Sequence, residues 1–136
     1  MSVGLAELVR TALDPEPRLI FALGFGSRFS GNPRPGSDLD LGLWFGTKVG
    51  FADLAELCLR IERATGIEPV DLVLLELADP LLRFEALRGK LLLCRDWEAY
   101  ARFFSLTCRE HEEEMARLAR FWHHWRTGAG TTRPGG

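Results

Sequence analysis

The chain has 136 residues, with 17 lysines and arginines against 19 aspartates and glutamates, and a formal net charge of −2. This length is typical of one domain, and a composition of 46% hydrophobic and 26% charged residues excludes general disorder. The nearly balanced charge excludes a protein that wraps nucleic acid by bulk charge, although it leaves room for a local phosphate site.

The first third of the chain predicts a helix, a buried strand, a loop and a second strand. Apolar spacing indicates a helix over residues 3–13, which the two prolines in residues 14–17 end. Residues 18–25 form a continuous apolar run with the length of a buried strand. Residues 26–36 are rich in Gly, Pro, Ser and Asn and predict a loop, and residues 38–45 begin with the alternation of a strand.

The rest of the chain alternates helices with short strands and ends in a long helix. It contains, in order, a helix (51–65) closed by Gly66, a strand (69–75), a short helix between Pro80 and Gly89, a strand (91–94), a long amphipathic helix (96–126) and a disordered tail (127–136). This alternation predicts an α/β or α+β domain with a small central sheet, held within residues 1–95. The long helix packs on that domain or extends it.

The long helix carries an aromatic stripe whose partner can be interpreted in two ways. The stripe comprises Trp97, Phe104, Trp122 and Trp125. The simplest interpretation is that this stripe is the seam that packs on the sheet. Phe103 and Phe121 lie off the stripe, however, and a small domain has little core left for a second face. A surface for a partner protein therefore remains an alternative.

The cysteines and the apolar runs predict a cytoplasmic protein. Cys58, Cys94 and Cys108 are odd in number and lack Cys-x-x-Cys spacing, which is typical of reduced thiols packed among apolar residues. The chain opens without the features of a signal peptide, and its longest apolar runs are far shorter than a membrane span. We therefore expect a cytoplasmic location and no contact with membranes.

Two carboxylates at the start of one strand predict a divalent metal site. Asp38 and Asp40 are two residues apart, so on a strand both side chains face the same side. Carboxylates this close repel each other, and one takes up a proton unless a cation lies between them. Mg²⁺ fits such a site because it uses one or two carboxylates together with phosphate oxygens. The alternative is a solvated strand edge.

Gly26 and Ser27 are the candidate phosphate contacts. Glycine lets the backbone approach an anion closely, and the turn that follows presents N–H groups and a hydroxyl. Asp71 stands alone in an apolar strand, where an unpaired carboxylate would be costly, so we expect it beside Asp38 and Asp40 as a third carboxylate. Each feature also has a simpler explanation, such as an ordinary turn or an exposed strand face. Their combination is more specific than its parts.

This combination resembles the minimal nucleotidyltransferase (MNT) domain of the polymerase-β-like superfamily. The resemblance rests on Gly26-Ser27, Asp38-x-Asp40 after ten residues, and Asp71 thirty-one residues later, and it covers about residues 3–95. It implies the nucleotidyltransferase fold, a mixed sheet of about four strands flanked by helices. It also implies Mg²⁺-dependent transfer of a nucleoside monophosphate from a nucleoside triphosphate, with ATP as the expected substrate and two Mg²⁺ ions.

The resemblance also implies roles for individual residues. Metal binding and catalysis fall to Asp38, Asp40 and Asp71, and nucleotide binding falls to Gly26, Ser27, Arg28 and Ser37. Metal bridging of the phosphates and in-line positioning then provide most of the catalysis. Arg28 and Arg34 could neutralise the leaving pyrophosphate. The alternatives are a surface ion pair for Arg28 and plain exposure for Arg34.

The short chain implies that the acceptor is another protein. Polymerase-type and antibiotic-modifying relatives carry further domains for the acceptor or the nucleic acid, whereas here one long helix follows residue 95. A nucleotidyltransferase of this size resembles the antitoxin of prokaryotic HEPN/MNT toxin–antitoxin modules. That resemblance implies AMP transfer to a tyrosine of a HEPN-domain ribonuclease toxin within a hetero-oligomer, and no direct binding of nucleic acid. Two alternatives stay open: an antitoxin that neutralises by binding alone, and an enzyme that modifies a small molecule.

Overall fold

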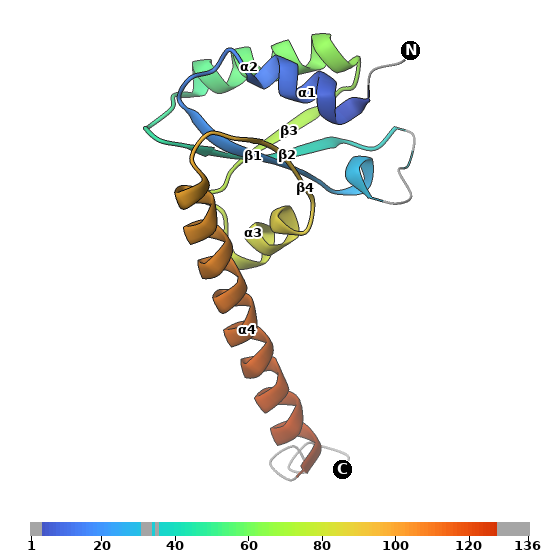
Figure 1. Ribbon diagram of the computed structural model, residues 1–136. Helices are drawn as coiled ribbons and strands as arrows, with labels where there is room; N and C mark the ends of the chain where they lie inside the picture. The colour runs from blue at the N-terminus through green and yellow to red at the C-terminus, as the bar shows by residue number, and fades with distance from the viewer. Residues whose placement is uncertain (1–3, 31–33, 35, 128–136) are drawn as a thin grey trace.

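Four short apolar segments of the chain pair into one mixed sheet with helices on both faces, as Figure 1 shows for the computed structural model. The structure describes residues 4–30, 34 and 36–127. In chain order the elements are α1 (Leu5–Leu13), β1 (Leu19–Phe25), the 3₁₀ turn η1 (Ser27–Phe29), β2 (Leu39–Phe45), α2 (Phe51–Thr65), β3 (Val70–Leu74), α3 (Pro80–Leu87), β4 (Lys90–Cys94) and α4 (Trp97–Thr127). The predicted α/β or α+β fold is confirmed.

The sheet has the strand order β3-β2-β1-β4. β1 runs antiparallel to both of its neighbours, whereas β2 and β3 are parallel. Every residue of β1 except Ile20 is buried, which explains why this strand reads as a continuous apolar run without polar alternation. The four strands match the mixed sheet that the resemblance implied.

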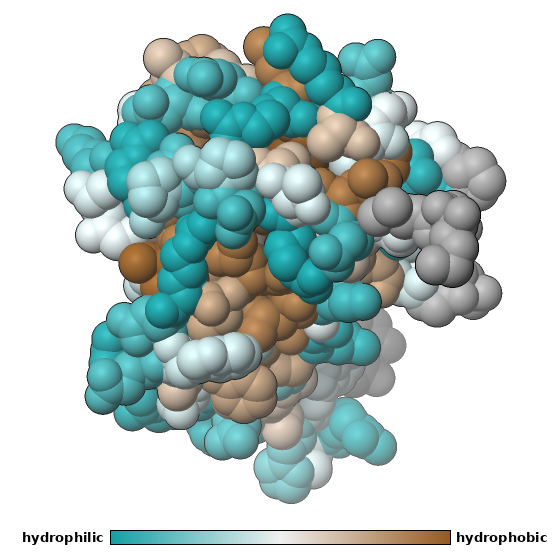
Figure 2. All heavy atoms as spheres, turned by 45° about the horizontal axis from the view of Figure 1, so that its top comes forward, coloured by the Kyte–Doolittle hydropathy of each residue, from teal (hydrophilic) through white to brown (hydrophobic). Residues whose placement is uncertain are grey.

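The helices divide between the two faces of the sheet. α1 and α2 lie together on one face, and α3 and the first turns of α4 lie on the other (Figure 1). Leu13 and Ile61 belong to the hydrophobic cluster under α1 and α2, whereas Phe21 and Phe103 belong to the cluster on the opposite face. Seen from the α1 and α2 side, the surface is mostly hydrophilic, with hydrophobic residues gathered near its centre (Figure 2).

α4 packs on the sheet through a stripe that differs from the predicted one. Phe103 is 3% exposed and its ring centroid lies 5.2 Å from that of Phe21, and Thr107 is fully buried. The next residue, Phe104, is turned by about 100° around the helix and points away from the core. The predicted seam is therefore wrong, because all of its members are exposed: Trp97, Phe104, Trp122 and Trp125.

The cysteines agree with the sequence-based expectation. Cys58, Cys94 and Cys108 are free thiols and half-buried. Within the described part of the chain, no helix combines the length and the hydrophobicity that crossing a membrane requires. The predicted disordered tail over residues 127–136 lies outside the described residues, apart from Thr127 at the end of α4.

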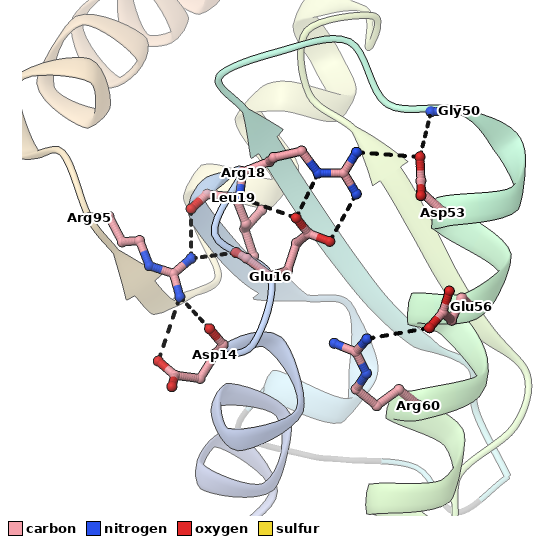
Figure 3. A network of polar contacts seen from close by, with 9 residues as sticks. All are labelled: Asp14, Glu16, Arg18, Leu19, Gly50, Asp53, Glu56, Arg60 and Arg95. Atoms are coloured by element: carbon pink, nitrogen blue, oxygen red, sulfur yellow. Dashed lines mark hydrogen bonds and ion pairs between the residues drawn. The ribbon is translucent and has the colours of Figure 1, made fainter.

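Arg95 joins the end of β4 to the segment between α1 and β1 (Figure 3). Its guanidinium donates hydrogen bonds to the backbone carbonyls of Asp14, Glu16 and Leu19 at 2.6–2.8 Å. Glu16 in turn accepts from the Arg18 guanidinium at 2.8 Å. These contacts fix the entry of the chain into the central strand.

Arg95→Ala is expected to lower the free energy of unfolding by about 1–2 kcal/mol, because three carbonyls lose a charged donor at once. Urea unfolding followed by circular dichroism measures the change. Arg88→Ala is the matched control, since it removes an ion pair with Glu85 whose side chains are 67% and 54% exposed. That variant should stay within about 0.5 kcal/mol of the wild type. Equal losses in the two variants would contradict the role given to Arg95.

Candidate active site

The parallel pairing of β2 and β3 places two aspartates side by side. Asp40 is the register partner of Asp71, between the pairs Leu39–Val70 and Leu41–Leu72. Register partners on neighbouring strands are about 4.8 Å apart in the direction of the backbone hydrogen bonds and face the same side. Asp38 directly precedes β2 and lies close enough for its charge to act on Asp40. The structure thus brings the three aspartates together at the end of the sheet where β2 and β3 begin.

The surroundings of Asp40 disfavour its negative charge. Burial raises the pKa of the Asp40 carboxyl, and repulsion from Asp71 and then Asp38 raises this pKa further. Asp40 is half-buried, whereas the other two aspartates are exposed. A cation held between these carboxylates would remove the repulsion, because an opposite charge favours the ionised form.

Gly26 brings the backbone directly against the Asp40 carboxylate. Its φ of 75° and ψ of −165° lie in a region that is essentially restricted to glycine. A Cβ atom at this position would clash with Oδ2 of Asp40. Glycine is therefore required here for two separate reasons, its backbone conformation and its close approach to a carboxylate.

The loop between β1 and β2 is held together by its own hydrogen bonds. The Ser27 hydroxyl oxygen accepts from the Arg34 backbone N–H at 2.9 Å and lies 3.3 Å from the Ser37 hydroxyl. The Ser37 hydroxyl donates to the Arg34 carbonyl at 2.8 Å, and Arg28 Nε donates to the Ser37 carbonyl at 2.9 Å. The two predicted serines are thus adjacent, one residue after Gly26 and one before Asp38.

The two loop arginines differ in their surroundings. Arg28 is half-buried and shapes the loop through its bond to Ser37, and no carboxylate pairs with it among the residues that the structure describes. The surface ion pair considered for Arg28 is therefore not found within the described residues. Arg34 is exposed, as the alternative interpretation proposed.

A hollow of about 460 Å³ opens beside Gly26. It is lined by Phe25, Gly26, Phe29, Ser30, Glu85, Arg88 and Gly89. Gly89 allows this arrangement, because a Cβ atom there would clash with the Gly24 carbonyl, so the end of α3 comes unusually close to β1. Phe29 and Arg88 line this hollow, although no sequence pattern singled them out. Gly89 between α3 and β4 was the available signal, although it was interpreted only as a helix end.

The carboxylate edge is open. Over residues 4–30, 34 and 36–127, no three His, Cys, Asp or Glu side chains converge closely enough to hold a metal ion by themselves. Such an edge suits Mg²⁺, which binds proteins through one or two carboxylates and fills its other positions with water and phosphate oxygens. The carboxylate oxygens of Asp38, Asp40 and Asp71 are donors of the kind that Mg²⁺ binds.

Comparison with known proteins finds a matching family model and several structures with a similar fold. The family model described as polymerase beta, nucleotidyltransferase matches residues 7–98. One chain in a crystal structure of a mutant MntA–HpeT toxin–antitoxin complex is 20% identical, with a TM-score of 0.70, over 89% of this chain and 97% of that one. A chain in a toxin–antitoxin complex with AMP-PNP is 22% identical, with a TM-score of 0.69, over 87% and 95% of the two chains.

A third similar structure contains a tri-AMPylated HEPN toxin of Shewanella oneidensis in complex with its MNT antitoxin. The matched chain is 20% identical, with a TM-score of 0.63, over 87% of this chain and 96% of that one. No curated protein matches this sequence. The structural likenesses establish the fold, and the family model covers about two thirds of the chain, including β1, β2 and β3. The chain therefore belongs to the polymerase β nucleotidyltransferase family.

Proposed function

We propose that this protein is a Mg²⁺-dependent adenylyltransferase that transfers AMP from ATP to a tyrosine hydroxyl of a HEPN-domain ribonuclease toxin, and that it acts as the antitoxin. The observation that carries the proposal is the contact between Gly26 and Asp40, with Asp71 in register beside Asp40. It places a turn suited to phosphate directly next to an edge of carboxylates.

In this proposal the residues of the site have separate roles in metal binding, proton transfer and triphosphate binding. Asp38 and Asp40 would hold Mg²⁺, and Asp71 would complete the metal site and accept the proton of the attacking hydroxyl as pyrophosphate leaves. Gly26 and Ser27 bind the triphosphate through the backbone and the hydroxyl. When bound, two Mg²⁺ ions would supply the positive charge that the phosphates need.

Arg28 and Ser37 support nucleotide binding by holding the loop. The Arg28 bond to the Ser37 carbonyl fixes the distance between the two ends of the loop. The Ser37 hydroxyl in turn lies beside that of Ser27, so a phosphate oxygen at this point would meet two hydroxyl groups. The hollow beside Gly26 is the space for the remainder of the nucleotide, with Arg88 at its edge.

The partner follows from what the similar structures contain. One of them holds AMP-PNP, and another holds a tri-AMPylated HEPN toxin bound to an MNT antitoxin. A phosphate ester on a tyrosine adds negative charge and bulk, which would disfavour RNA at a ribonuclease site. We therefore expect a neighbouring gene to encode a HEPN-domain protein with an Arg-x-x-x-x-His motif, and the two proteins to form a hetero-oligomer.

The decisive experiment combines the purified protein, ATP labelled at the α-phosphate, Mg²⁺ and that HEPN protein. We expect label on a tyrosine of the HEPN protein, no label when EDTA removes the metal, and loss of ribonuclease activity in step with labelling. Labelling is measured by gel autoradiography, and the modified residue by mass spectrometry.

Two other results would replace the proposal. Neutralisation of the ribonuclease without any labelling would indicate an antitoxin that acts by binding alone. Turnover of ATP with a small hydroxyl compound, in the absence of the HEPN protein, would indicate an enzyme for small molecules.

A further inference from the structure

The second half of α4 extends beyond the rest of the fold (Figure 1). Over residues 112–127 only Glu114 is half-buried, and every other residue is exposed. Five large apolar side chains in this segment are between 42% and 58% exposed: Met115, Leu118, Phe121, Trp122 and Trp125. An exposed apolar face of this kind indicates a surface that another protein covers.

The spacing of this face identifies the kind of partner. Met115, Leu118, Trp122 and Trp125 follow one another at steps of three, four and three residues. This alternation of three and four residues is the spacing by which two helices pack along a common seam. The face therefore fits a second helix.

The charges beside this seam indicate that the second helix is the same segment of another copy. Glu112 and Arg126 lie on the same flank of the seam, seven residues before and seven residues after Ala119. An antiparallel pair would place Glu112 of each copy opposite Arg126 of the other. A parallel pair would not bring these two charges together, because Glu112 and Arg126 lie fourteen residues apart along the helix.

We propose that α4 forms an antiparallel homodimer through residues 112–127, with Leu118 of each copy against Trp122 of the other. This register also places Met115 against Trp125 of the second copy, and it centres the two-fold axis beside Ala119 and Arg120. The contact is self-complementary, as a two-fold interface must be. It is independent of the proposed enzymatic activity.

A hollow at the base of the segment supports this register. It has a volume of about 290 Å³ and is lined by Asp79, Pro80, Leu81, His111, Glu114, Met115 and Leu118. In the proposed dimer, Trp125 of the second copy reaches Met115 and therefore lies over this hollow. Buried tryptophans are typical anchors of protein interfaces. Leu81, which is 67% exposed in one copy, would pack against that indole.

The dimer leaves the candidate active site open. α4 leaves the sheet at the end opposite to η1, which follows Gly26 (Figure 1). The paired segment is about 24 Å long at 1.5 Å per residue and runs away from the sheet. Both sites of a dimer can therefore meet an acceptor protein at the same time.

The test measures the mass of the full chain by sedimentation equilibrium at low salt. We expect the wild type to approach twice 15.3 kDa as its concentration rises. Glu112→Arg alone and Arg126→Glu alone should each weaken dimerisation about tenfold or more, because two like-charge contacts replace two attractive ones. An equimolar mixture of the two variants should restore the dimer, since each copy then meets the opposite charge.

Glu113→Arg is the matched control, because it makes the same change of charge one residue further round the helix, away from the seam. It should dimerise like the wild type, and circular dichroism should show equal helix content in all variants. A wild type that remains at 15.3 kDa overturns the proposal and leaves this face to a different protein. A dimer that the mixture fails to restore, or that Glu113→Arg weakens equally, also overturns it.

Discussion

Asp40→Asn is expected to lower the rate of AMP transfer by about a thousandfold or more, because metal binding supplies several kcal/mol of the stabilisation of the transition state. Asp40 is the central carboxylate of the site, since it is in register with Asp71 and directly contacts Gly26. An amide oxygen at this position binds a hard cation far more weakly than a carboxylate does. Transfer of labelled AMP to the HEPN protein is the measurement.

The same variant should be more stable than the wild type when Mg²⁺ is absent. Burial and the charges of Asp71 and Asp38 raise the pKa of Asp40 in the folded chain, so its ionisation weakens the fold. The stability that belongs to the protonated carboxyl is present at low pH and is lost as the pH rises through this raised pKa. Asparagine does not ionise, so at neutral pH the melting temperature of Asp40→Asn should exceed that of the wild type.

Addition of Mg²⁺ with ATP should reverse this order. The ligands should raise the melting temperature of the wild type, because they bind only the folded state, and should change that of Asp40→Asn much less. Asp96→Asn is the control, since Asp96 accepts backbone hydrogen bonds from Glu98 and Ala99 at the start of α4 and asparagine caps a helix equally well. That variant should keep full transfer. An Asp40→Asn protein with the transfer rate of the control would eliminate the metal site.

The parts of the fold that local residues control could be predicted from the sequence. α2 ends at Thr65, and Gly66 follows with a φ of 73° in the left-handed region, as a glycine at the end of a helix predicts. The apolar run of β1 predicted a buried strand. Burial on both faces of the sheet leaves no polar alternation in its sequence. The spacing of the aspartates placed them at strand positions, and the parallel register of β2 and β3 then brought Asp40 and Asp71 together.

The rotation of α4 about its own axis could not be predicted in this way. The helix offers two apolar stripes, and its period alone does not say which one meets the sheet. Phe103 is selected because the rings of Phe21 and Trp44 lie against it, and these two residues come from distant parts of the chain. The other stripe is then left exposed. The wrong prediction of the seam is therefore what reveals the exposed apolar face of α4.

The position of Arg88 was missed for a related reason. Residues of α3 reach the candidate site only because Gly89 lets the chain pass very close to Gly24, which no local pattern predicts. The hydrogen bonds of Arg95 join positions that are 76 to 81 residues apart in the sequence. Contacts of this range depend on the complete topology of the sheet.

Gly26→Ala is expected to impair both stability and activity. The backbone conformation of Gly26 is strained for alanine, which lowers the free energy of unfolding by about 1–3 kcal/mol. In addition, the new Cβ atom must displace the Asp40 carboxylate from its position. We expect AMP transfer to fall at least about a hundredfold, because a displacement of about 1 Å in a catalytic group has effects of that size. Chemical unfolding and transfer of labelled AMP measure the two effects separately.

Gly66→Ala separates the strain from the clash. Gly66 has a φ of 73°, close to the 75° of Gly26, but a Cβ atom there meets no other atom within 4 Å. This variant should lose about 1 kcal/mol of stability and keep full transfer and the full response to Mg²⁺. If Gly26→Ala keeps the transfer rate of Gly66→Ala, the contact with Asp40 does not shape the site. If both variants lose transfer equally, general instability explains the loss. A loss confined to Gly26→Ala means that the missing side chain of this glycine is what allows a phosphate-binding turn to lie against a carboxylate.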